Sequence, residues 1–508
     1  MTIDVTENYF TKYASSETLS RIVPLPSVCH MWQKCASEYA DITAVCDGTE
    51  YTYGELDEDV AEFRSALSEK GLKSGDHVGI LVPNSYDFIK AYLAVQTLGC
   101  VAVLLPVHLD TQAVFGCSVK YNLKAIVYSA ATEDKMSLLA KSNTIQINVN
   151  EKGSAFVDIC MMNPENDSTI IFTGGTSGKN KGALLTHQSV MSGVINGCYG
   201  YEPVFNQRYM LVLPLTHVFG LIRNTLTPLY TGGTVFICRN PKDMFRDMAV
   251  FNPTILVLVP ALAEMMLTLT KQFKRNMWGN SLRHIICGAS AVPPYLVKEY
   301  ATYGIKLFPG YGLTESANLV SGNPENAAKP ESVGLPYPGQ QLRIEDGELW
   351  LKGSNMMKCY YGDDEENRNA FTDGWFKTGD LVRIDEDGFI YITGRKKDVI
   401  VLSTGENISP EEIETAFSRL DFLQDVMVYE DYIGERQVLT LEVYPRALQV
   451  AKLEADDKEA YMKEQIQKVN MSLPAFQRIS KIIIRDQDFE RTPAMKKVRK
   501  NGNNKTAD

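Results

Sequence analysis

The sequence lacks the features that mark membrane-spanning, secreted and zinc-binding proteins. No apolar run is long enough to cross a membrane, and the N-terminus has neither the basic start nor the apolar core of a signal peptide. The ten cysteines form no CxxC pair, and most stand in apolar surroundings, as Cys238 and Cys287 do. We therefore expect a cytoplasmic protein with reduced, buried thiols and no integral membrane association.

Positive charge is also scarce. Lys and Arg number 51 against 62 Asp and Glu, which leaves a net charge of −11 and argues against nucleic acid as a partner. The hydrophobic share of 44% and the charged share of 22% are ordinary for a globular protein. At 508 residues the chain is too long for one compact core, so two or more domains are expected.

Short apolar runs that alternate with amphipathic segments predict an α/β fold with parallel sheets covered by helices. A capping box at 52–55 begins a helix, and a strand over 77–82, a helix over about 85–98 and a strand over 101–105 form a βαβ unit. The residues before about Pro26 show no clean period and are expected to lie over the surface. Further strands are expected at residues 125–128, 170–172, 210–213, 235–238, 255–259, 283–287 and 306–308.

The character of the chain changes after Pro330. Asp-Gly turns at 346–347 and 387–388 each join two strands and predict an antiparallel β subdomain over about 331–394. Helices over about 410–418 and 453–469, with strands near 426–429 and 439–443, are expected beyond it. The predicted organisation is a large N-terminal domain (1–394), a hinge (395–398), a small mobile α+β domain (399–500) and a disordered tail (501–508).

A glycine-rich loop follows the strand expected at 170–172. Its glycines allow backbone N–H groups to approach an anion, its hydroxyls add donors, and a lysine adds positive charge, which together suit a phosphate group. It is not a Walker loop, because Thr173 stands where that motif has Gly and Asn180 where it has Ser or Thr. A flexible surface turn is the alternative. The residues expected to bind phosphate are Thr173, Gly174, Gly175, Thr176, Ser177, Gly178 and Lys181.

Loops after later strands carry a histidine and two glycines with possible roles in a pocket. His217 stands beside apolar residues, and a lone histidine in that setting is more often a satisfied core residue than a functional one. Gly220 and Gly288 remove bulk, which leaves room for an aryl or an alkyl group without choosing between them.

The loop after the strand at 306–308 carries groups suited to a nucleotide. Tyr311 is flanked by two glycines, which allows a planar group such as adenine to lie against it. Thr314 can donate to a phosphate, and the carboxylate of Glu315 can hold Mg²⁺. The alternative is a turn in which Thr-Glu opens a helix.

Three later stretches each have a structural alternative. Asp380 can accept hydrogen bonds from both hydroxyls of a ribose while Arg395 also reaches the sugar. Alternatively, the two residues can form a surface ion pair that contributes little to stability. The turn at 403–412 caps a helix. The segment 491–500 is basic and would ordinarily be a solvated tail.

In this order, the motifs resemble those of the adenylate-forming superfamily, which contains acyl-CoA synthetases, adenylation domains of peptide synthetases and beetle luciferases. The phosphate loop of that family reads Thr-Ser-Gly-Thr/Ser-Thr-Gly-x-Pro-Lys-Gly, and here Gly174 stands for the first Ser and Asn180 for Pro. The stretch 394–407 is similar to fatty-acid-activating members, the fatty acid–CoA ligases. Six ordered matches from Thr173 to Lys496 span most of the chain.

The resemblance implies a role for each motif. Glu315 is implied to hold Mg²⁺, Thr314 the α-phosphate and Tyr311 the adenine, with Asp380 and Arg395 on the ribose. Further cofactor-binding residues that it implies are Gly288, Ala289, Ser290 and Gly312. It also implies Gly405, on a loop that reaches the site in the second half-reaction and lines the thiol channel.

The resemblance also implies residues for catalysis and domain movement. Lys496 matches the lysine that bridges the attacking carboxylate and the α-phosphate, and alignment from Thr492 favours it over the neighbouring Lys497. His217 is implied to stand at the mouth of the acyl pocket, and Lys397 at the hinge.

The activity implied is ATP- and Mg²⁺-dependent activation of a fatty or aryl acid to an acyl-adenylate, with release of pyrophosphate and then transfer to CoA. Val218 stands where amino-acid-activating domains normally place Asp, which disfavours an amino acid. One alternative acceptor is the thiol of a stand-alone carrier protein. A catalytically inactive nucleotide-binding protein is disfavoured because Glu315, Asp380, Arg395 and Lys496 are all present.

Overall fold

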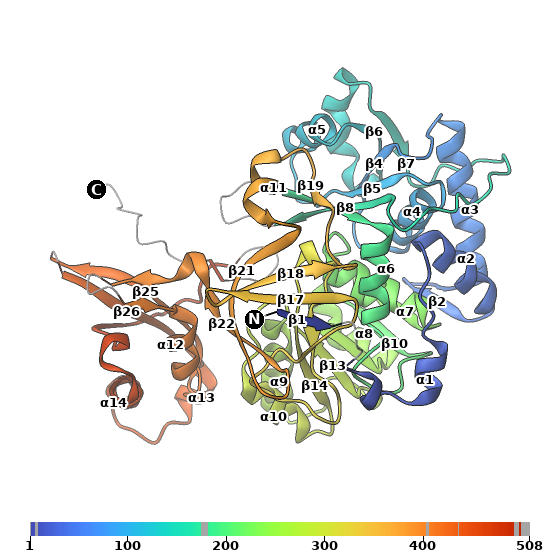
Figure 1. Ribbon diagram of the computed structural model, residues 1–508. Coiled ribbons are helices and arrows are strands. Elements are labelled where there is room, and N and C mark those ends of the chain that lie inside the picture. Colours follow the sequence, from blue (N-terminus) through green and yellow to red (C-terminus); the bar gives the residue numbers. More distant parts are fainter. Residues whose placement is uncertain are drawn as a thin grey trace.

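The structure contains a large body and a smaller one beside it. The computed structural model describes residues 2–5, 9–173, 181–402, 406–434, 436–491 and 497–498, with only the backbone described at 2–5, 141, 407 and 448. Figure 1 shows the large body in blue to light orange and the smaller body, in deeper orange to red, to one side of it. Within the described ranges, no helix combines the length and apolarity needed to cross a bilayer.

The first large sheet follows the predicted βαβ alternation. Its strands, in spatial order, are β19 (Cys359–Tyr360), β9 (Lys181–Thr186), β8 (Asp167–Thr173), β5 (Val101–Leu104), β4 (His77–Leu81), β6 (Leu123–Tyr128) and β7 (Ile145–Asn148). The strands from β8 to β7 run parallel, and β9 and β19 are antiparallel. Its helices are α2 (Val28–Glu38), α3 (Tyr53–Glu69), α4 (Tyr86–Thr97), α5 (Thr111–Lys120) and η2 (Ala130–Lys141). The capping box predicted at Thr52 and Glu55 is confirmed at the start of α3.

The second large sheet supplies the strand ends from which several site loops emerge. Its strands, in spatial order, are β16 (Leu335–Pro336), β15 (Ser321–Gly322), β14 (Lys306–Tyr311), β13 (His284–Cys287), β12 (Ile255–Leu258), β10 (Arg208–Leu211), β11 (Thr234–Ile237), β2 (Thr43–Cys46) and β3 (Glu50–Thr52). The strands from β14 to β2 run parallel. The helices around it are α6 (His187–Asn196), the π-helix η3 (Phe219–Leu226), α7 (Thr227–Tyr230), η4 (Pro241–Asp243), α8 (Met244–Phe251), α9 (Pro260–Phe273) and α10 (Pro294–Ala301). β10 ends at Leu211 rather than the expected Leu213, and β14 continues to Tyr311.

An antiparallel sheet follows, as the two Asp-Gly turns predict. Its strands are β1 (Thr2–Val5), β17 (Gln340–Glu345), β18 (Glu348–Gly353), β21 (Trp375–Ile384), β20 (Phe371–Thr372) and β22 (Ile390–Arg395), with α11 (Asp364–Ala370) before β20. β17 and β18 are joined through Asp346 and Gly347, both with positive φ, of 49° and 80°. β22 then leads through η6 (Lys396–Asp398) into the smaller body.

Most of the described residues between 9 and 26 are exposed or half-buried, in line with the expectation that this segment lies over the surface, but Phe10, Thr18 and Ile22 are buried. β1 pairs with β17, and the chain continues through η1 (Thr11–Tyr13) and α1 (Ser16–Arg21). Phe10 is fully buried, and its ring stacks on that of Tyr337 with centroids 4.8 Å apart. The sequence did not predict the burial of Phe10, because a single contact with a distant partner leaves no periodic pattern.

The smaller body has its own hydrophobic core, which includes Phe417, Leu441 and Ile466. Its elements are β23 (Ile400–Val401), β24 (Asn407–Ile408), α12 (Pro410–Phe417), β25 (Leu423–Ile433), β26 (Arg436–Pro445), α13 (Ala447–Ala451), α14 (Lys458–Ser472), η7 (Ala475–Gln477) and β27 (Lys481–Ile484). α14 starts later than expected, because the Asp457 side chain accepts a hydrogen bond from the Ala460 N–H and caps the helix there. The α/β fold class with a separate α+β unit is confirmed.

Replacing Phe10 by Ala is expected to lower the free energy of unfolding of the large body by about 3–5 kcal/mol, because a buried ring is lost and a cavity remains. Phe156→Ala is the matched control, since Phe156 is 90% exposed. This substitution should change the free energy of unfolding by less than about 0.5 kcal/mol. Urea unfolding followed by tryptophan fluorescence measures both. Equal, small effects would show that the N-terminal segment adds nothing to the core.

Candidate active site

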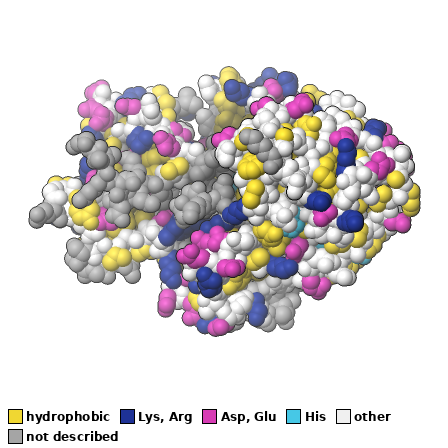
Figure 2. Space-filling model, turned by 90° about the horizontal axis from the view of Figure 1, so that it is seen from above, with side chains coloured by type: hydrophobic (Ala, Val, Ile, Leu, Met, Phe, Trp, Pro, Cys, Tyr) yellow, Lys and Arg dark blue, Asp and Glu magenta, His cyan; other side chains and the backbone are white. Residues whose placement is uncertain are grey.

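Several of the predicted site residues line one cleft between the two bodies. The cleft has a volume of about 3270 Å³, well above the roughly 300–1,000 Å³ of a usual small-molecule site. The predicted residues in its wall are Ala289, Ser290, Tyr311, Gly312, Asp380, Arg395 and Lys397. On the face shown in Figure 2, basic and acidic side chains are interspersed rather than gathered into fields of one sign.

Other predicted residues lie elsewhere. The described ones outside this lining are Thr173, Lys181, His217, Gly288, Thr314 and Glu315. Thr173 and Lys181 are partners on the neighbouring strands β8 and β9. The predictions that fall outside the described residues are Gly174, Gly175, Thr176, Ser177, Gly178, Gly405 and Lys496.

Asp380, Arg395 and Tyr311 form a polar cluster in the cleft. Asp380 and Arg395 are direct partners on the antiparallel strands β21 and β22, and Arg395 Nε lies 2.7 Å from Asp380 Oδ1. The Tyr311 hydroxyl donates to the other oxygen, Oδ2, at 2.5 Å. Burial and then the Asp380 charge raise the pKa of Tyr311, so its hydroxyl stays protonated and remains a donor.

The charge of Asp380 also affects the pKa of its basic partner, Arg395. Burial by itself would lower the pKa of Arg395, but attraction to Asp380 and to other groups around it together outweighs burial and raises the pKa. The Asp380 side chain is only 3% exposed, against 38% for Arg395. A buried carboxylate held by one guanidinium and one phenol, beside an open cleft, is suited to accept hydrogen bonds from a diol.

Glu315 belongs to a second cluster that links it to Lys181. The Tyr360 hydroxyl donates to Glu315 Oε1 at 2.6 Å. The Lys181 ammonium lies over the Tyr360 ring, 5.1 Å from its centroid, and pairs with Glu366 at 2.5 Å. Burial, followed by the Glu315 charge, raises the pKa of Tyr360 and keeps it a donor.

This arrangement fits a Mg²⁺ ion that is bound mainly through its substrate. In the described part of the chain, no three or more His, Cys, Asp or Glu side chains gather as a ready-made metal site. Mg²⁺ usually keeps several waters and binds one or two carboxylates together with substrate phosphates. Among the described residues only Oε1 of Glu315 is hydrogen-bonded, which leaves Oε2 for such an ion.

Tyr360 and Glu366 were missed by the sequence analysis. Tyr360 is in a two-residue strand, and Glu366 lies in the acidic first turn of α11, where carboxylates are common for helix stability alone. Neither position has a local signal that separates function from structure.

The loop that carries His217 is positioned by the other sheet. Asn84, which follows β4, donates to the carbonyl of Leu213 at 2.8 Å and accepts from the N–H of Leu215 at 2.9 Å. His217 itself is half-buried and stands just before η3. The sequence analysis missed this role of Asn84, because a single amide between a strand and a helix is typical of a residue that only ends the strand.

Gly220 does not enlarge the pocket, contrary to the expectation that it removes bulk. A Cβ at this position would lie 2.2 Å from the Pro214 carbonyl oxygen, so the missing side chain lets two backbone segments touch. Gly312 is constrained in the same way, with a Cβ placed 1.2 Å from the Asn318 carbonyl oxygen. Both glycines serve close backbone approach around the site.

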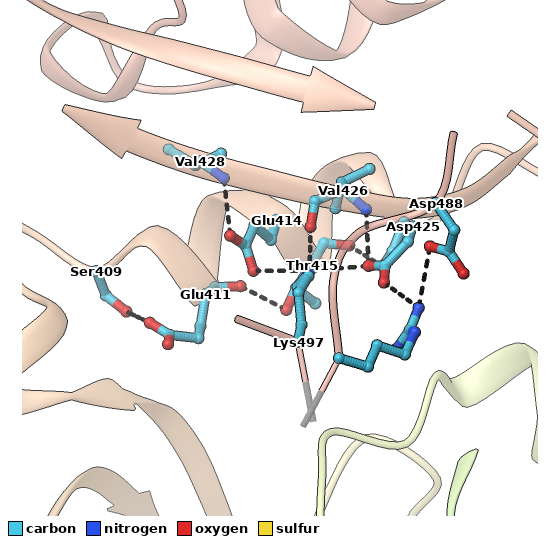
Figure 3. A network of polar contacts seen from close by, with 11 residues as sticks. Ser409, Glu411, Glu414, Thr415, Asp425, Val426, Val428, Asp488 and Lys497 are labelled. Carbon is cyan, nitrogen blue, oxygen red and sulfur yellow. Dashed lines mark hydrogen bonds and ion pairs between the residues drawn. The ribbon is translucent and has the colours of Figure 1, made fainter. Parts of the chain in front are cut away.

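In the smaller body, Lys497 is committed to a polar network drawn in Figure 3. Its ammonium lies 2.8 Å from Asp425 Oδ1 and 3.8 Å from Glu414 Oε2, and it also donates to the Val426 carbonyl. Arg491 pairs with Asp425 as well, at 2.7 Å. Lys497 therefore lines the cleft with its ammonium bound to partners of its own body.

An ion pair at Arg446 is among the contacts that join the two bodies directly. Arg446 pairs with Glu264 of α9 at 2.6 Å and donates to the Tyr295 hydroxyl at 2.7 Å. Its guanidinium also lies over the Tyr295 ring, 4.6 Å from the centroid. Burial raises the pKa of Glu264, although the Arg446 charge opposes the rise.

Two family models match the chain. The model described as AMP-binding enzyme matches residues 32–361, and the model described as AMP-binding enzyme C-terminal domain matches residues 397–508.

Curated relatives of the chain are CoA ligases. The long-chain-fatty-acid–CoA ligase FadD15 of Mycobacterium bovis is 27% identical over 558 residues, which cover 91% of this chain and 92% of the relative. The 2-succinylbenzoate–CoA ligase of Bacillus velezensis is 30% identical over 395 residues, which cover 74% of this chain and 79% of the relative.

Solved structures share the fold. The o-succinylbenzoate CoA synthetase of Bacillus subtilis, in complex with the acyl-adenylate OSB-AMP, has a TM-score of 0.79 at 23% identity and covers 94% of this chain and 97% of that one. The anthranilate CoA ligase AuaEII, in complex with anthranoyl-AMP, has a TM-score of 0.84 at 18% identity, with 94% and 96% covered.

The two family models, which together cover most of both bodies, define an adenylate-forming class of enzyme. The chain belongs to the AMP-binding enzyme family. It is an acid–thiol ligase of the acyl-CoA synthetase type, which forms an acyl-adenylate with ATP and Mg²⁺ and uses CoA as the acceptor substrate, as the sequence analysis predicts.

Replacing Arg395 by Met removes the guanidinium that lies 2.7 Å from the Asp380 carboxylate. We expect the free energy of unfolding at pH 7 to fall by about 1–3 kcal/mol. The deficit should shrink as the pH is lowered toward 5, because a buried carboxylate without its cation has a raised pKa and takes up a proton.

Arg275→Met is the control, because Arg275 is exposed and the substitution removes the same charge. Urea unfolding of both variants at several pH values measures the difference. A deficit in Arg395→Met that does not change with pH would contradict a buried, charged Asp380.

Proposed function

We propose that the polar cluster of Asp380, Arg395 and Tyr311 holds the ribose and adenine of ATP, and that Glu315 holds the Mg²⁺ bound to its phosphates. The observation that carries this proposal is the buried carboxylate of Asp380, which lines the cleft, pairs with Arg395 and accepts a hydrogen bond from Tyr311. A carboxylate in this setting binds two adjacent hydroxyls well and is of little use as a surface ion pair.

The first half-reaction brings two anions together. An oxygen of the acid attacks the α-phosphorus, an O–P bond forms, and the bond to pyrophosphate breaks. Repulsion between the anions must be offset by cations and donors already in place, and we assign this task to Lys181, Thr314 and Lys496. Mg²⁺, when bound through Glu315, neutralises phosphate charge.

In the second half-reaction a thiol attacks the acyl carbon, and AMP leaves. We propose that the smaller body rotates about Lys397 between the two steps, so that Lys496 leaves the site and the Gly405 loop enters it. Position 397 supports this role, because it lies in η6, directly after β22 and before the smaller body.

The acid is proposed to be a fatty or an aryl acid. Val218, which is 6% exposed, offers no charge to pair with an α-ammonium group, and this supports an acid without one. The printed names of the relatives include a long-chain-fatty-acid–CoA ligase and a feruloyl-CoA synthase. We also propose the cytoplasm as the compartment, because all ten cysteines are free thiols, as is typical of a reducing environment.

Mass spectrometry of the products from ATP, Mg²⁺ and a panel of carboxylic acids, with and without CoA, tests the proposal. Acyl-CoA is expected to accumulate only when CoA is added, and the enriched product names the acid. Acyl-adenylate that builds up unchanged by CoA would favour a carrier protein as the acceptor. Tight ATP binding without turnover of any acid would favour an inactive nucleotide-binding protein.

The catalytic assignment to Lys496 has a matched control in Lys497. Lys496→Ala is expected to slow adenylate formation by at least about 100-fold, because a donor aimed at the reacting anions is lost. Transfer of supplied acyl-adenylate to CoA should stay within about twofold of the wild type. Lys497→Ala should keep both steps, since Lys497 is bound to Asp425.

Pyrophosphate release measures the first step, and acyl-CoA formed from synthetic acyl-adenylate measures the second. If Lys496→Ala lost both steps or neither, Lys496 would have no specific role in adenylation. If Lys497→Ala alone lost adenylation, the role would pass to Lys497.

A further inference from the structure

Arg223 is a buried cation without an acidic partner. It lies in η3, is 2% exposed and, in the part of the chain that the structure describes, forms no ion pair with Asp or Glu. An arginine side chain stays protonated in proteins. Burying an unpaired charge is costly, so an isolated buried guanidinium needs an explanation.

The groups around Arg223 use only part of the hydrogen-bonding capacity of its guanidinium. Its guanidinium lies over the Tyr201 ring, 5.3 Å from the centroid, and close to the hydroxyls of Tyr201 and Tyr209. These two hydroxyls are themselves 2.6 Å apart and bonded to each other. Nη1 of Arg223 is buried and has no described hydrogen-bond partner.

Two more buried donors lie on the segments packed around Arg223. Nδ2 of Asn196, in α6, and Nδ2 of Asn318 have no described partner, and the side chains are 3% and 6% exposed. The three segments meet at Gly193, where a Cβ would lie 2.3 Å from the Ala317 carbonyl oxygen and 3.0 Å from Ile222. Asn318 follows Ala317, and Arg223 follows Ile222. The side chains of Arg223, Asn196 and Asn318 therefore each carry a buried donor without a described acceptor, and they lie on three segments that meet at one point of the core.

The position of η3 relates this point to the acyl pocket. Phe219, at the start of η3, faces the end of β13, since its Cζ is 3.7 Å from a Cβ placed on Gly288. Arg223 follows Phe219 by about one turn of a π-helix, on the same side and farther from His217. An acid that enters past His217 and extends along η3 would bring its far end toward Arg223.

We propose that the substrate acid carries a second anionic group, a carboxylate remote from the reacting carboxyl, and that Arg223 binds it. The proposal rests on the proposed function, because it concerns the same acyl pocket. A carboxylate accepts from a guanidinium and from amide N–H groups, so it would supply the acceptor that the buried donors lack. An alkyl end in the same place would leave the charge of Arg223 unpaired.

The test compares acids that differ only at the far end: hexanoate with adipate, octanoate with suberate, and 4-phenylbutyrate with 4-(4-carboxyphenyl)butyrate. Pyrophosphate release gives kcat/KM for each acid. For the best pair, the wild type is expected to favour the dicarboxylic acid by about 100-fold or more, because a site built for a polar group rejects the analogue without it.

Arg223→Met should remove this preference or reverse it, with the KM for ATP within about twofold of the wild type. Arg223→Lys keeps a positive charge and should keep a weaker preference of the same sign, which preserves the test if the Met variant does not fold. Arg275→Met, at an exposed position, controls for net charge and should behave as the wild type.

A wild-type preference for the methyl-ended acid in every pair would overturn the inference and leave the proposed function standing. So would an Arg223→Met variant that slows both acids of a pair equally. Absence of pyrophosphate release with every acid would contradict the proposed function itself, and the inference would fall with it.

Discussion

The ion pair between Asp380 and Arg395 joins the nucleotide cleft to the exit of the chain from the large body. Arg395 is the last residue of β22, and η6 and the smaller body follow at once. The group that pairs with the buried carboxylate is thus also the first residue of the hinge predicted at 395–398. Any rotation of the smaller body begins from a point that this pair holds in place.

The rest of the site is assembled from strand ends of separate sheets. Tyr311 ends β14 of the second large sheet, Lys181 begins β9 of the first, and Asp380 comes from the antiparallel sheet. Tyr360 contacts residues of both large sheets, because its hydroxyl donates to Glu315, which follows β14, and its ring lies under the ammonium of Lys181 in β9. The relative positions of the residues that we propose to bind the nucleotide therefore depend on how three sheets pack.

Much of this organisation could be predicted from the sequence, because it rests on local patterns. Strand periodicity, the capping box at Thr52 and the turn at Asp346 each act over a few residues. The parts that could not be predicted are single contacts between distant residues, such as Phe10 on Tyr337 or Asn84 on the loop before His217. Glycines are ambiguous for a related reason, since Gly220 has no side chain whether it opens a pocket or lets two backbones touch.

The contact of Arg446 with Glu264 and Tyr295 gives the two bodies a preferred resting arrangement. Its side chains are mostly buried between the bodies, at 18% exposure for Arg446 and 19% for Glu264. An arrangement that separates them must hydrate both charges and find another partner for each. The ion pair therefore favours the arrangement in which Arg446 is docked over any arrangement that separates it from Glu264.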